Sequence, residues 1–342
     1  MFWNSDLQDE FKFKWDLCSE KQKLHTTCTK TRMASFSVTD ASYLEVSKHY
    51  CLSTTHGTLH FIHGSPSAHW ETFRLIEFPT VPTCLENNFQ KTNKSSTCQL
   101  FIGDHKGNVY ILTFLFPRTM LFARDYSLGT QIIRFEDLRK HRSYIKCRKV
   151  SRVHWDVIDK IHHIPQHDFL VSNSKLDTLN PLVLQDISTV PSSKTYRHIK
   201  GVTCFDLNNH LNIIVTGSRD FIIRTWDVRF CKYPVMLLEG HKAVVSDLRV
   251  CSKGDTLLSI CKEAELIIWD LRSGNTLHKL VLTFPTLRQQ IYGKPTLHTS
   301  PKNENYFFVT CCDFTFKLFF NDIQDARKEE KYITLKKGNE KI

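Results

Sequence analysis

The stretch Ile214–Arg229 reads IVTGSRDFIIRTWDVR, and a related stretch, LLSICKEAELIIWDLR, follows at Leu257–Arg272. Both contain two short apolar segments, the second of which ends on Trp-Asp-x-Arg, and they begin 43 residues apart. A repeat period of about 40–50 residues is typical of folds that are built from successive small sheets. The pair therefore predicts a structural unit that recurs along the chain.

Four polar or aromatic positions recur at equal spacing in the two copies. A histidine lies 28 residues before the tryptophan, a hydroxyl residue ten before it and an acidic residue six before it. A histidine ring can bond both a hydroxyl and a carboxylate, while the indole N–H needs an acceptor. Because the set recurs, it predicts a buried structural cross-link in preference to a catalytic triad. The members are His198, Thr216, Asp220 and Trp226 in the first copy and His241, Ser259, Glu263 and Trp269 in the second.

Strand ends equivalent to Trp226 recur along the whole chain. Their intervals are 47, 50, 73, 41, 43 and 50 residues, and all but the third fit a four-stranded propeller blade. The long interval predicts one blade with an insertion. The sequence therefore predicts an all-β propeller of about seven four-stranded blades over residues 1–320. The strand ends are Trp15, Ile62, Leu112, Gln185, Trp226, Trp269 and Phe319.

The first predicted blade is incomplete, because the residues before Trp15 supply only part of it. Two explanations stay open. A closing strand within residues 331–336 supplies the missing part, or the chain is a shortened form of a longer protein with an exposed strand edge. We favour the second explanation. Residues 321–342 otherwise mix both charges and predict a solvated tail.

Two segments between the predicted strands differ in character. Asn87–Thr97 is polar and predicts a surface loop. Residues 134–152 predict a basic helical insertion, because Phe135, Leu138 and Ile145 are spaced for one helix face. That helix is either a solvated face of the propeller or a docking arm for an acidic partner. The candidate partner-binding residues on it are Arg139, Arg142, Lys146 and Arg148.

The sequence Glu239-Gly240-His241, followed by Ile268-Trp269-Asp270, resembles the signature of WD-repeat propellers of the β-transducin type. Over Glu136–Arg272 the chain is also similar to a group of ciliary and sperm-flagellar proteins that includes WD repeat-containing proteins 49 and 64. It departs from them at His154-Trp155-Asp156, where the order of Trp and Asp is reversed.

That resemblance implies a non-enzymatic scaffold that binds other proteins. It implies a cytoplasmic location, with the cilium or flagellar axoneme as the preferred site, and axonemal or microtubule-associated partners. Members of the group carry two propellers, which fits a shortened chain. The calcium-binding hands of some members do not carry over, because the sequence contains no EF-hand loop.

The two Trp-Asp-x-Arg sequences indicate an alternative function. They resemble the WDxR box of propellers that dock cullin ubiquitin-ligase adaptors, in which Arg229 and Arg272 could present planar guanidinium groups. Thr225 departs from the aliphatic residue of that box. Many WD repeats end in this way without a ligase role, so a substrate receptor of a cullin-RING ligase is the alternative function.

Composition and motifs argue against several other classes of function. The net charge of +11 fits an acidic partner, but only Tyr144 in the basic segment could stack on a base, so nucleic acid is disfavoured. The apolar run Val109–Phe116 is far shorter than the roughly 20 residues of a membrane-spanning helix. The sequence lacks phosphate-binding and hydrolase motifs, CxxC and HExxH. It predicts no catalytic residue, cofactor or metal site, and it leaves the oligomeric state open.

Overall fold

The computed structural model of the 342-residue chain describes residues 37–64, 70–91, 96–117, 119–123, 129–176, 179–187, 192–196, 201–208, 211–230, 232–251, 255–283, 294–299, 305–311, 314–320 and 332–334. All of them belong to Ser37–Ile342, the larger of two compact units into which contacts divide the chain. The smaller unit, Met1–Phe36, lies outside the described residues, and with it the predicted first blade that ends at Trp15.

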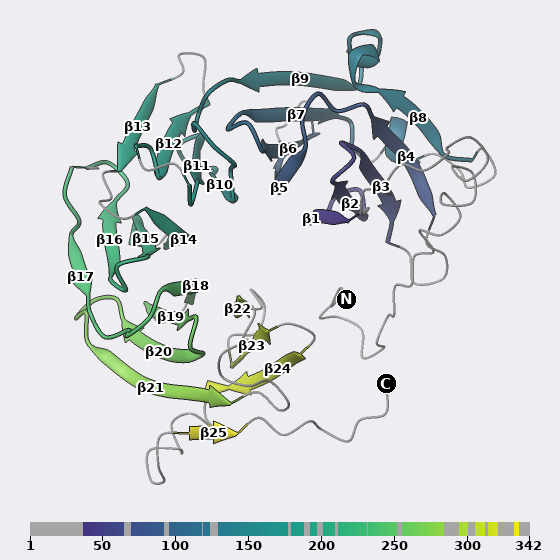
Figure 1. Ribbon diagram of the computed structural model, residues 1–342. Coiled ribbons are helices and arrows are strands. Elements are labelled where there is room, and N and C mark those ends of the chain that lie inside the picture. Colours follow the sequence, from purple (N-terminus) through teal and green to yellow (C-terminus); the bar gives the residue numbers. More distant parts are fainter. Residues whose placement is uncertain are drawn as a thin grey trace, which may run out of the picture. The chain divides into compact units, whose positions relative to one another are not determined.

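Six small sheets follow one another through the described residues and confirm the predicted all-β propeller architecture (Figure 1). Neighbouring strands run antiparallel except where β8 and β25 join a sheet edge. The first sheet contains β1 (Val38–Leu44), β2 (His49–Thr54), β3 (Leu59–His63), β4 (Glu71–Ile76) and β8 (Gln131–Arg134). The second contains β5 (Pro82–Lys91), β6 (Ser96–Asp104), β7 (Val109–Leu115) and β9 (Ile145–Val150). The third contains β10 (Lys160–Ile164), β11 (Phe169–Asn173), β12 (Leu182–Asp186) and β13 (Ser193–Tyr196).

The remaining described sheets complete the succession. The fourth sheet contains β14 (Val202–Asn208), β15 (Ile213–Ser218), β16 (Ile223–Asp227) and β17 (Met236–Leu238). The fifth contains β18 (Val245–Cys251), β19 (Thr256–Cys261), β20 (Glu265–Asp270), β21 (Thr276–Thr283) and β25 (Tyr332–Thr334). The sixth contains β22 (Thr296–Thr299), β23 (Tyr306–Cys311) and β24 (Phe314–Phe319).

The predicted strand ends lie in the third strand of each described sheet. These residues are Ile62 in β3, Leu112 in β7, Gln185 in β12, Trp226 in β16, Trp269 in β20 and Phe319 in β24.

The innermost strands of successive sheets are tied together by aspartate side chains. Asp40 on β1 accepts the backbone N–H of Leu85 on β5 at 2.7 Å. Asp206 on β14 accepts that of Val250 on β18 at 2.9 Å, and Asp247 on β18 accepts that of Leu297 on β22 at 3.0 Å. Such charge-assisted bonds to a backbone N–H are stronger than neutral ones. The same kind of bond therefore links three pairs of neighbouring sheets, and Figure 1 shows these strands facing a common interior.

The apolar core lies between successive sheets. Between the β10–β13 and β14–β17 sheets it includes Val171, Leu184, Tyr196, Phe205 and Trp226, all at most 2% exposed. Alternating residues of each strand face one of the two neighbouring sheets, so both faces are buried, which explains the nearly continuous apolar third strands.

The turn between β6 and β7 packs directly on the chain that leads to β10. Gly107 adopts a φ of +73° there, and a Cβ at this position would lie 2.0 Å from the carbonyl oxygen of His154. The His154 N–H also donates to the Gly107 oxygen at 3.1 Å. Glycine is required because the backbone conformation is left-handed and the two chains touch. The contact fixes the backbone that carries the His154 ring.

The predicted basic helix over residues 134–152 is wrong for most of its length. The chain forms β8, then the 3-10 helix η3 (Phe135–His141), and then strand β9, which pairs with β7 from Phe114↔Ile145 to Val109↔Val150. Phe135 and Leu138 do share the inner face of η3, as their spacing predicts. Ile145 instead packs as a strand residue, because pairing with β7 overrides local helical spacing.

Two other segments differ from their predictions. The loop predicted at Asn87–Thr97 is mostly hairpin, because β5 extends to Lys91 and β6 starts at Ser96, with Phe89 paired to Cys98. In the tail, Tyr332–Thr334 forms β25, which runs parallel to β21 at the outer edge of that sheet. It therefore does not supply an innermost strand to the first blade.

Candidate functional site

The first predicted cross-link is present as a bond between Trp226 and Thr216. The Trp226 ring is 1% exposed and donates its indole N–H to the Thr216 hydroxyl at 2.9 Å. Tyr196 meets the same ring edge-on, with the ring centroids 5.6 Å apart. Strand pairing explains this arrangement, since Ile214↔Trp226 brings the strand ends together. His198 lies outside the described residues.

Asp220, the predicted acidic member, binds an arginine of the following strand. Its two carboxylate oxygens accept Arg224 guanidinium N–H groups at 3.0 and 2.7 Å, and it also accepts the Ile222 N–H at 3.2 Å. Burial alone would raise the pKa of Asp220, but the bonds from Arg224 and Ser218 hold that pKa below its usual value. The carboxylate therefore stays charged and fixes the turn before β16.

The second predicted cross-link is more complete, but one member differs. The Ser259 hydroxyl bonds the His241 Nε2 atom at 2.7 Å and accepts the Trp269 indole N–H at 2.8 Å. The acid beside His241 is Glu265, whose Oε2 atom lies 3.4 Å from His241 Nδ1. The predicted Glu263 is exposed in the turn, so that assignment is wrong. The reason is the tight turn before β20, where Ala264 has a φ of +58°, which turns Glu263 outward and Glu265 inward.

A third cross-link of the same kind involves His154, which the repeat spacing around the two tryptophans did not predict. Its Nε2 atom lies 2.8 Å from the Ser172 hydroxyl, and its Nδ1 atom lies 2.7 Å from the Asn180 oxygen. The signal was the spacing of 18 residues, which His241 and Ser259 share. It was missed because Gln185, and not a tryptophan, occupies the third-strand position paired with Leu170.

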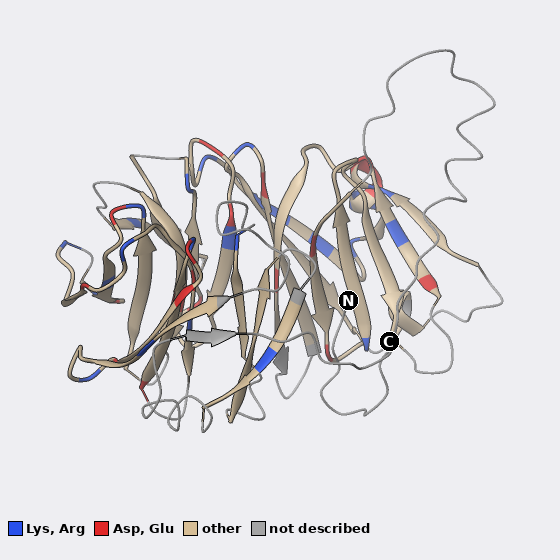
Figure 2. Ribbon diagram, turned by 60° about the horizontal axis from the view of Figure 1, so that its bottom comes forward, with Lys and Arg blue, Asp and Glu red and all other residues tan. Residues whose placement is uncertain are grey.

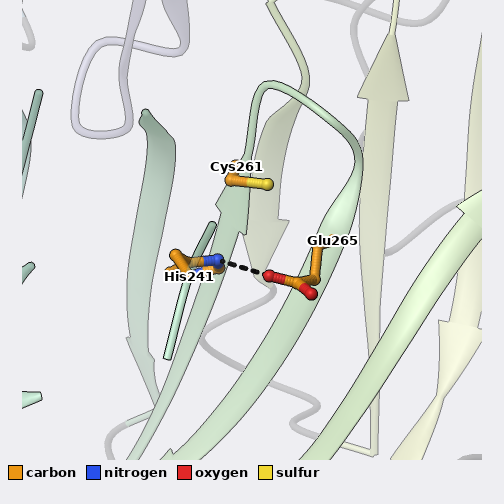
Figure 3. Close-up of side chains that lie close together, drawn as sticks. All are labelled: His241, Cys261 and Glu265. Atoms are coloured by element: carbon orange, nitrogen blue, oxygen red, sulfur yellow. Dashed lines mark ion pairs between the residues drawn. The ribbon is translucent and has the colours of Figure 1, made fainter. Parts of the chain in front are cut away.

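Cys261 lies beside His241 and Glu265 in the β18–β21 sheet (Figure 3). Burial lowers the pKa of His241 to about 4, although the Glu265 charge acts in the opposite direction, so the ring is neutral near pH 7. Lys279 Nζ lies 2.9 Å from the other Glu265 oxygen, Oε1. Among the described residues this is the group of histidine, cysteine and acidic side chains close enough to hold a metal ion.

The two Trp-Asp-x-Arg arginines are not equivalent. The Arg229 side chain is 75% exposed and lies 3.5 Å from Asp227. Arg272 instead donates from Nε to Asp255, a buried acid at the start of β19. Both side chains are largely exposed, at 75% for Arg229 and 66% for Arg272, but only Arg272 is bound to a buried acid.

Several exposed apolar side chains follow Arg229 in the chain. Its guanidinium lies 6.0 Å from the ring centroid of Phe230. An exposed apolar group of this kind is typical of an interaction surface. Its members are Phe230, Tyr233, Val235 and Leu237, which are 70, 81, 65 and 50% exposed.

The predicted basic residues fall into two groups. Arg139, Arg142 and Lys146 border a hollow of about 900 Å³ beside β9, which Lys149 and the acidic Glu136 also border. Arg148 lies on the other face of β9 and donates to the Ile187 oxygen at 2.6 Å, so it links its sheet to the next one. We call the first hollow, with its bordering residues, the β9 groove.

The floor of the β9 groove is apolar. It is formed by Tyr110, Phe135, Leu138 and Ile145, and the Lys149 ammonium lies 5.3 Å from the Tyr110 ring centroid. Figure 2 shows Lys and Arg on several sheets, intermingled with Asp and Glu. The β9 groove is distinguished by basic residues that gather around an apolar floor, and not by the net charge of the chain.

Comparison with known proteins agrees with this architecture. The family described as WD domain, G-beta repeat matches residues 190–227, which contain β13 to β16. Two proteins named WD repeat-containing protein on Y chromosome, from Drosophila grimshawi and Drosophila virilis, are each 23% identical and cover 67% of this chain. The protein of that name from Anopheles gambiae is 28% identical over 33% of this chain.

The matched part of the chain spans 20, 19 and 11% of these three relatives, which is about a fifth of their length or less. The six-sheet fold, the Trp–hydroxyl bonds and the matched repeat together define a WD-repeat propeller. The chain therefore contains one matched WD repeat and is similar, at 23% identity, to WD repeat-containing proteins on Y chromosome. Among the described residues, no helix has the length and apolar character needed to cross a membrane.

Proposed function

We propose that the chain is a non-enzymatic scaffold that binds other proteins, and that an acidic partner docks in the β9 groove. The observation that carries this proposal is the combination of an apolar floor with a basic rim in one hollow of about 900 Å³. A floor of aromatic and aliphatic side chains accepts an apolar anchor, while the rim selects acidic neighbours of that anchor.

The position of the groove suits docking. β9 is the outer edge strand of its sheet, and Lys146, Cys147, Arg148 and Lys149 on it are all exposed. Charged residues on an edge strand also prevent unspecific pairing with other strands. That role alone would not require the apolar floor, which is why we assign a binding role to the groove.

The cellular setting is part of the proposal. The resemblance of Glu136–Arg272 to ciliary and flagellar WD-repeat proteins supports a cytoplasmic scaffold at the axoneme. Microtubules are polyanionic filaments, and such an acidic surface would complement the groove.

The test is a triple charge reversal, Arg139→Glu, Arg142→Glu and Lys146→Glu. A matched control carries Lys106→Glu, Lys242→Glu and Lys262→Glu, three exposed lysines away from the groove. Both variants and the wild type serve as bait in extract from ciliated tissue or testis, read by mass spectrometry. We expect axonemal proteins on the wild type and the control, and a loss of about tenfold or more on the groove variant, equivalent to about 1.4 kcal/mol. Equal capture of axonemal proteins on all three baits would refute docking in the β9 groove.

Docking of a cullin adaptor is a second candidate function, because Arg229 is exposed beside Phe230 and exposed apolar residues follow it in the chain. The structure predicts different effects of substitution at the two arginines of the Trp-Asp-x-Arg sequences. Arg229→Ala should abolish capture of adaptor subunits, whereas Arg272→Ala should leave it within about twofold, since Arg272 is held by Asp255. If the wild type captures no adaptor, or both variants capture it as well as the wild type does, this function is excluded.

A further inference from the structure

A buried cluster of three side chains with metal-binding donors lies within one sheet, away from the β9 groove. His241 precedes β18, Cys261 ends β19 and Glu265 begins β20 (Figure 3). One donor atom from each, an imidazole nitrogen, the thiol sulfur and a carboxylate oxygen, lie within 4.8 Å of one another. The three residues are 7, 0 and 8% exposed. We propose that His241, Cys261 and Glu265 bind a zinc ion.

Two of the donor atoms lie opposite each other as an ion pair but form no hydrogen bond. His241 Nδ1 and Glu265 Oε2 are buried, and neither has a hydrogen-bond partner among the described residues. Their separation of 3.4 Å is too long for a good hydrogen bond. A buried polar atom left without a partner costs about 1–3 kcal/mol. A shared metal ion would satisfy both atoms at once.

The hydrogen bonds around the cluster suit metal binding. The Ser259 hydroxyl can accept N–H groups from both His241 Nε2 and Trp269, because its own proton has the Ile267 oxygen as an acceptor at 3.3 Å. In that arrangement His241 Nδ1 carries a lone pair directed at the cluster. Metal-bound histidines commonly donate their second ring N–H to an oxygen that fixes the tautomer.

The carboxylate is held in a similar way. Lys279 binds Glu265 Oε1 at 2.9 Å, which orients the carboxylate and leaves Oε2 for the ion. Ligating carboxylates are usually hydrogen-bonded on their second oxygen. Lys279 is 39% exposed, so its ammonium adds a charge at the rim of the cluster and not within it.

Cys261 and Glu265 face each other across the tight turn between β19 and β20. Burial raises the pKa of the Cys261 thiol, while backbone hydrogen bonds from Glu265 and Glu263 act in the opposite direction by favouring the thiolate. On binding, the thiol proton would leave for solvent, and the thiolate and carboxylate would balance the charge of Zn²⁺. Nitrogen, sulfur and oxygen donors together favour zinc over calcium or magnesium. The three donors leave the fourth position of a tetrahedral ion for water.

Cobalt(II) is the probe for the test, because it replaces zinc and reports a thiolate ligand by a charge-transfer band. The full chain is purified with chelator, exchanged into buffer and titrated with cobalt. We expect a stoichiometric thiolate–cobalt band that zinc removes. Cys261→Ser should abolish the band. Cys147→Ser, an exposed thiol, and Cys311→Ser, a buried thiol in another sheet, should keep it. No band, or an unchanged band in Cys261→Ser, would overturn the proposal.

A second readout separates metal binding from a structural role of the same residues. Circular dichroism first shows which variants fold without metal. Zinc should then raise the melting temperature of the wild type and of Cys147→Ser, because a ligand bound to the folded state stabilises it. The melting temperatures of folded Cys261→Ser and Glu265→Gln should not respond to zinc. A wild type that does not respond would also overturn the proposal, and neither outcome bears on the β9 groove.

Discussion

Trp226 and Trp269 each fill the space between two successive sheets, and each donates its indole N–H to a hydroxyl oxygen ten residues earlier. Their surroundings nevertheless differ. The acid in the turn before Trp226 binds Arg224, whereas the corresponding Glu263 is exposed and Glu265 approaches His241. The tryptophan and its hydroxyl are thus the shared part of the two cross-links, and the acid is the variable part.

The buried tryptophan should contribute strongly to stability. Trp226→Ala is expected to lower the free energy of unfolding by about 3–5 kcal/mol, because it empties a site between two sheets. Trp155→Ala is the control, since that ring is 68% exposed, and it should cost less than about 1 kcal/mol. Urea unfolding followed by circular dichroism measures both. Equal losses would contradict the packing of Trp226.

The Asp220–Arg224 pair can be tested by a double-mutant cycle. Asp220→Ala alone should cost about 1–3 kcal/mol, since it leaves a largely buried guanidinium without its partner. The coupling energy with Arg224→Ala should be about 1 kcal/mol. Urea unfolding of the four proteins gives this value. A coupling near zero would place the main interaction of Asp220 elsewhere, with His198 as the candidate.

At the level of elements, two outer edges are extended by strands that come from elsewhere in the chain. β8 runs parallel to β4, and β25 runs parallel to β21 (Figure 1). An unpaired edge exposes backbone N–H and C=O groups, so each added strand satisfies part of an edge. The insertion between β7 and β9 therefore joins two blades, which explains the long interval between Leu112 and Gln185.

Two neighbouring isoleucines of β8 test whether the strand is part of the core. Ile133 is 2% exposed and Ile132 is 61% exposed. Ile133→Ala should lower the free energy of unfolding by about 2–5 kcal/mol, and Ile132→Ala by less than about 0.5 kcal/mol. Chemical denaturation measures both. If the two variants unfold alike, β8 is not packed on the sheet in solution.

Across the whole molecule, the innermost strands bring charged groups of different sheets together. Glu86 on β5 has its carboxylate 3.4 Å from His162 on β10. Burial, the largest effect, raises the pKa of Glu86 to about 7, and lowers the pKa of His162 to about 4. The other charged groups that act on Glu86 are Lys160, Asp40, Asp206 and Arg249.

The raised pKa of Glu86 predicts a pH-dependent stability. The folded chain holds the Glu86 proton more tightly than the unfolded chain, whose glutamate has its ordinary pKa near 4.5. The stabilisation from this proton is present below pH 4.5 and is lost as the pH rises through about 7. Glu86→Gln, which mimics the protonated acid, should therefore gain melting temperature relative to wild type between pH 5 and pH 8. Glu45→Gln, at an exposed position, is the control, and equal shifts in both variants would contradict the prediction.

The sequence by itself determined the repeating sheets and part of their cross-links. The spacing of Trp226 and Thr216, and of His241, Ser259 and Trp269, predicted bonds that the structure contains. Such features are predictable because strand alternation, turn length and the reach of a side chain are local, and the same local pattern recurs in each blade.

Only the tertiary structure decided how the less regular segments pair as strands and which acidic side chain lies beside His241 and Cys261. Ile145 entered a strand, and Tyr332–Thr334 joined β21, because partners distant in sequence offered free backbone groups. Glu265 replaced Glu263 beside His241 and Cys261, because the backbone of one tight turn sets which acid points inward. These outcomes depend on the contacts between distant segments, which residue spacing does not encode.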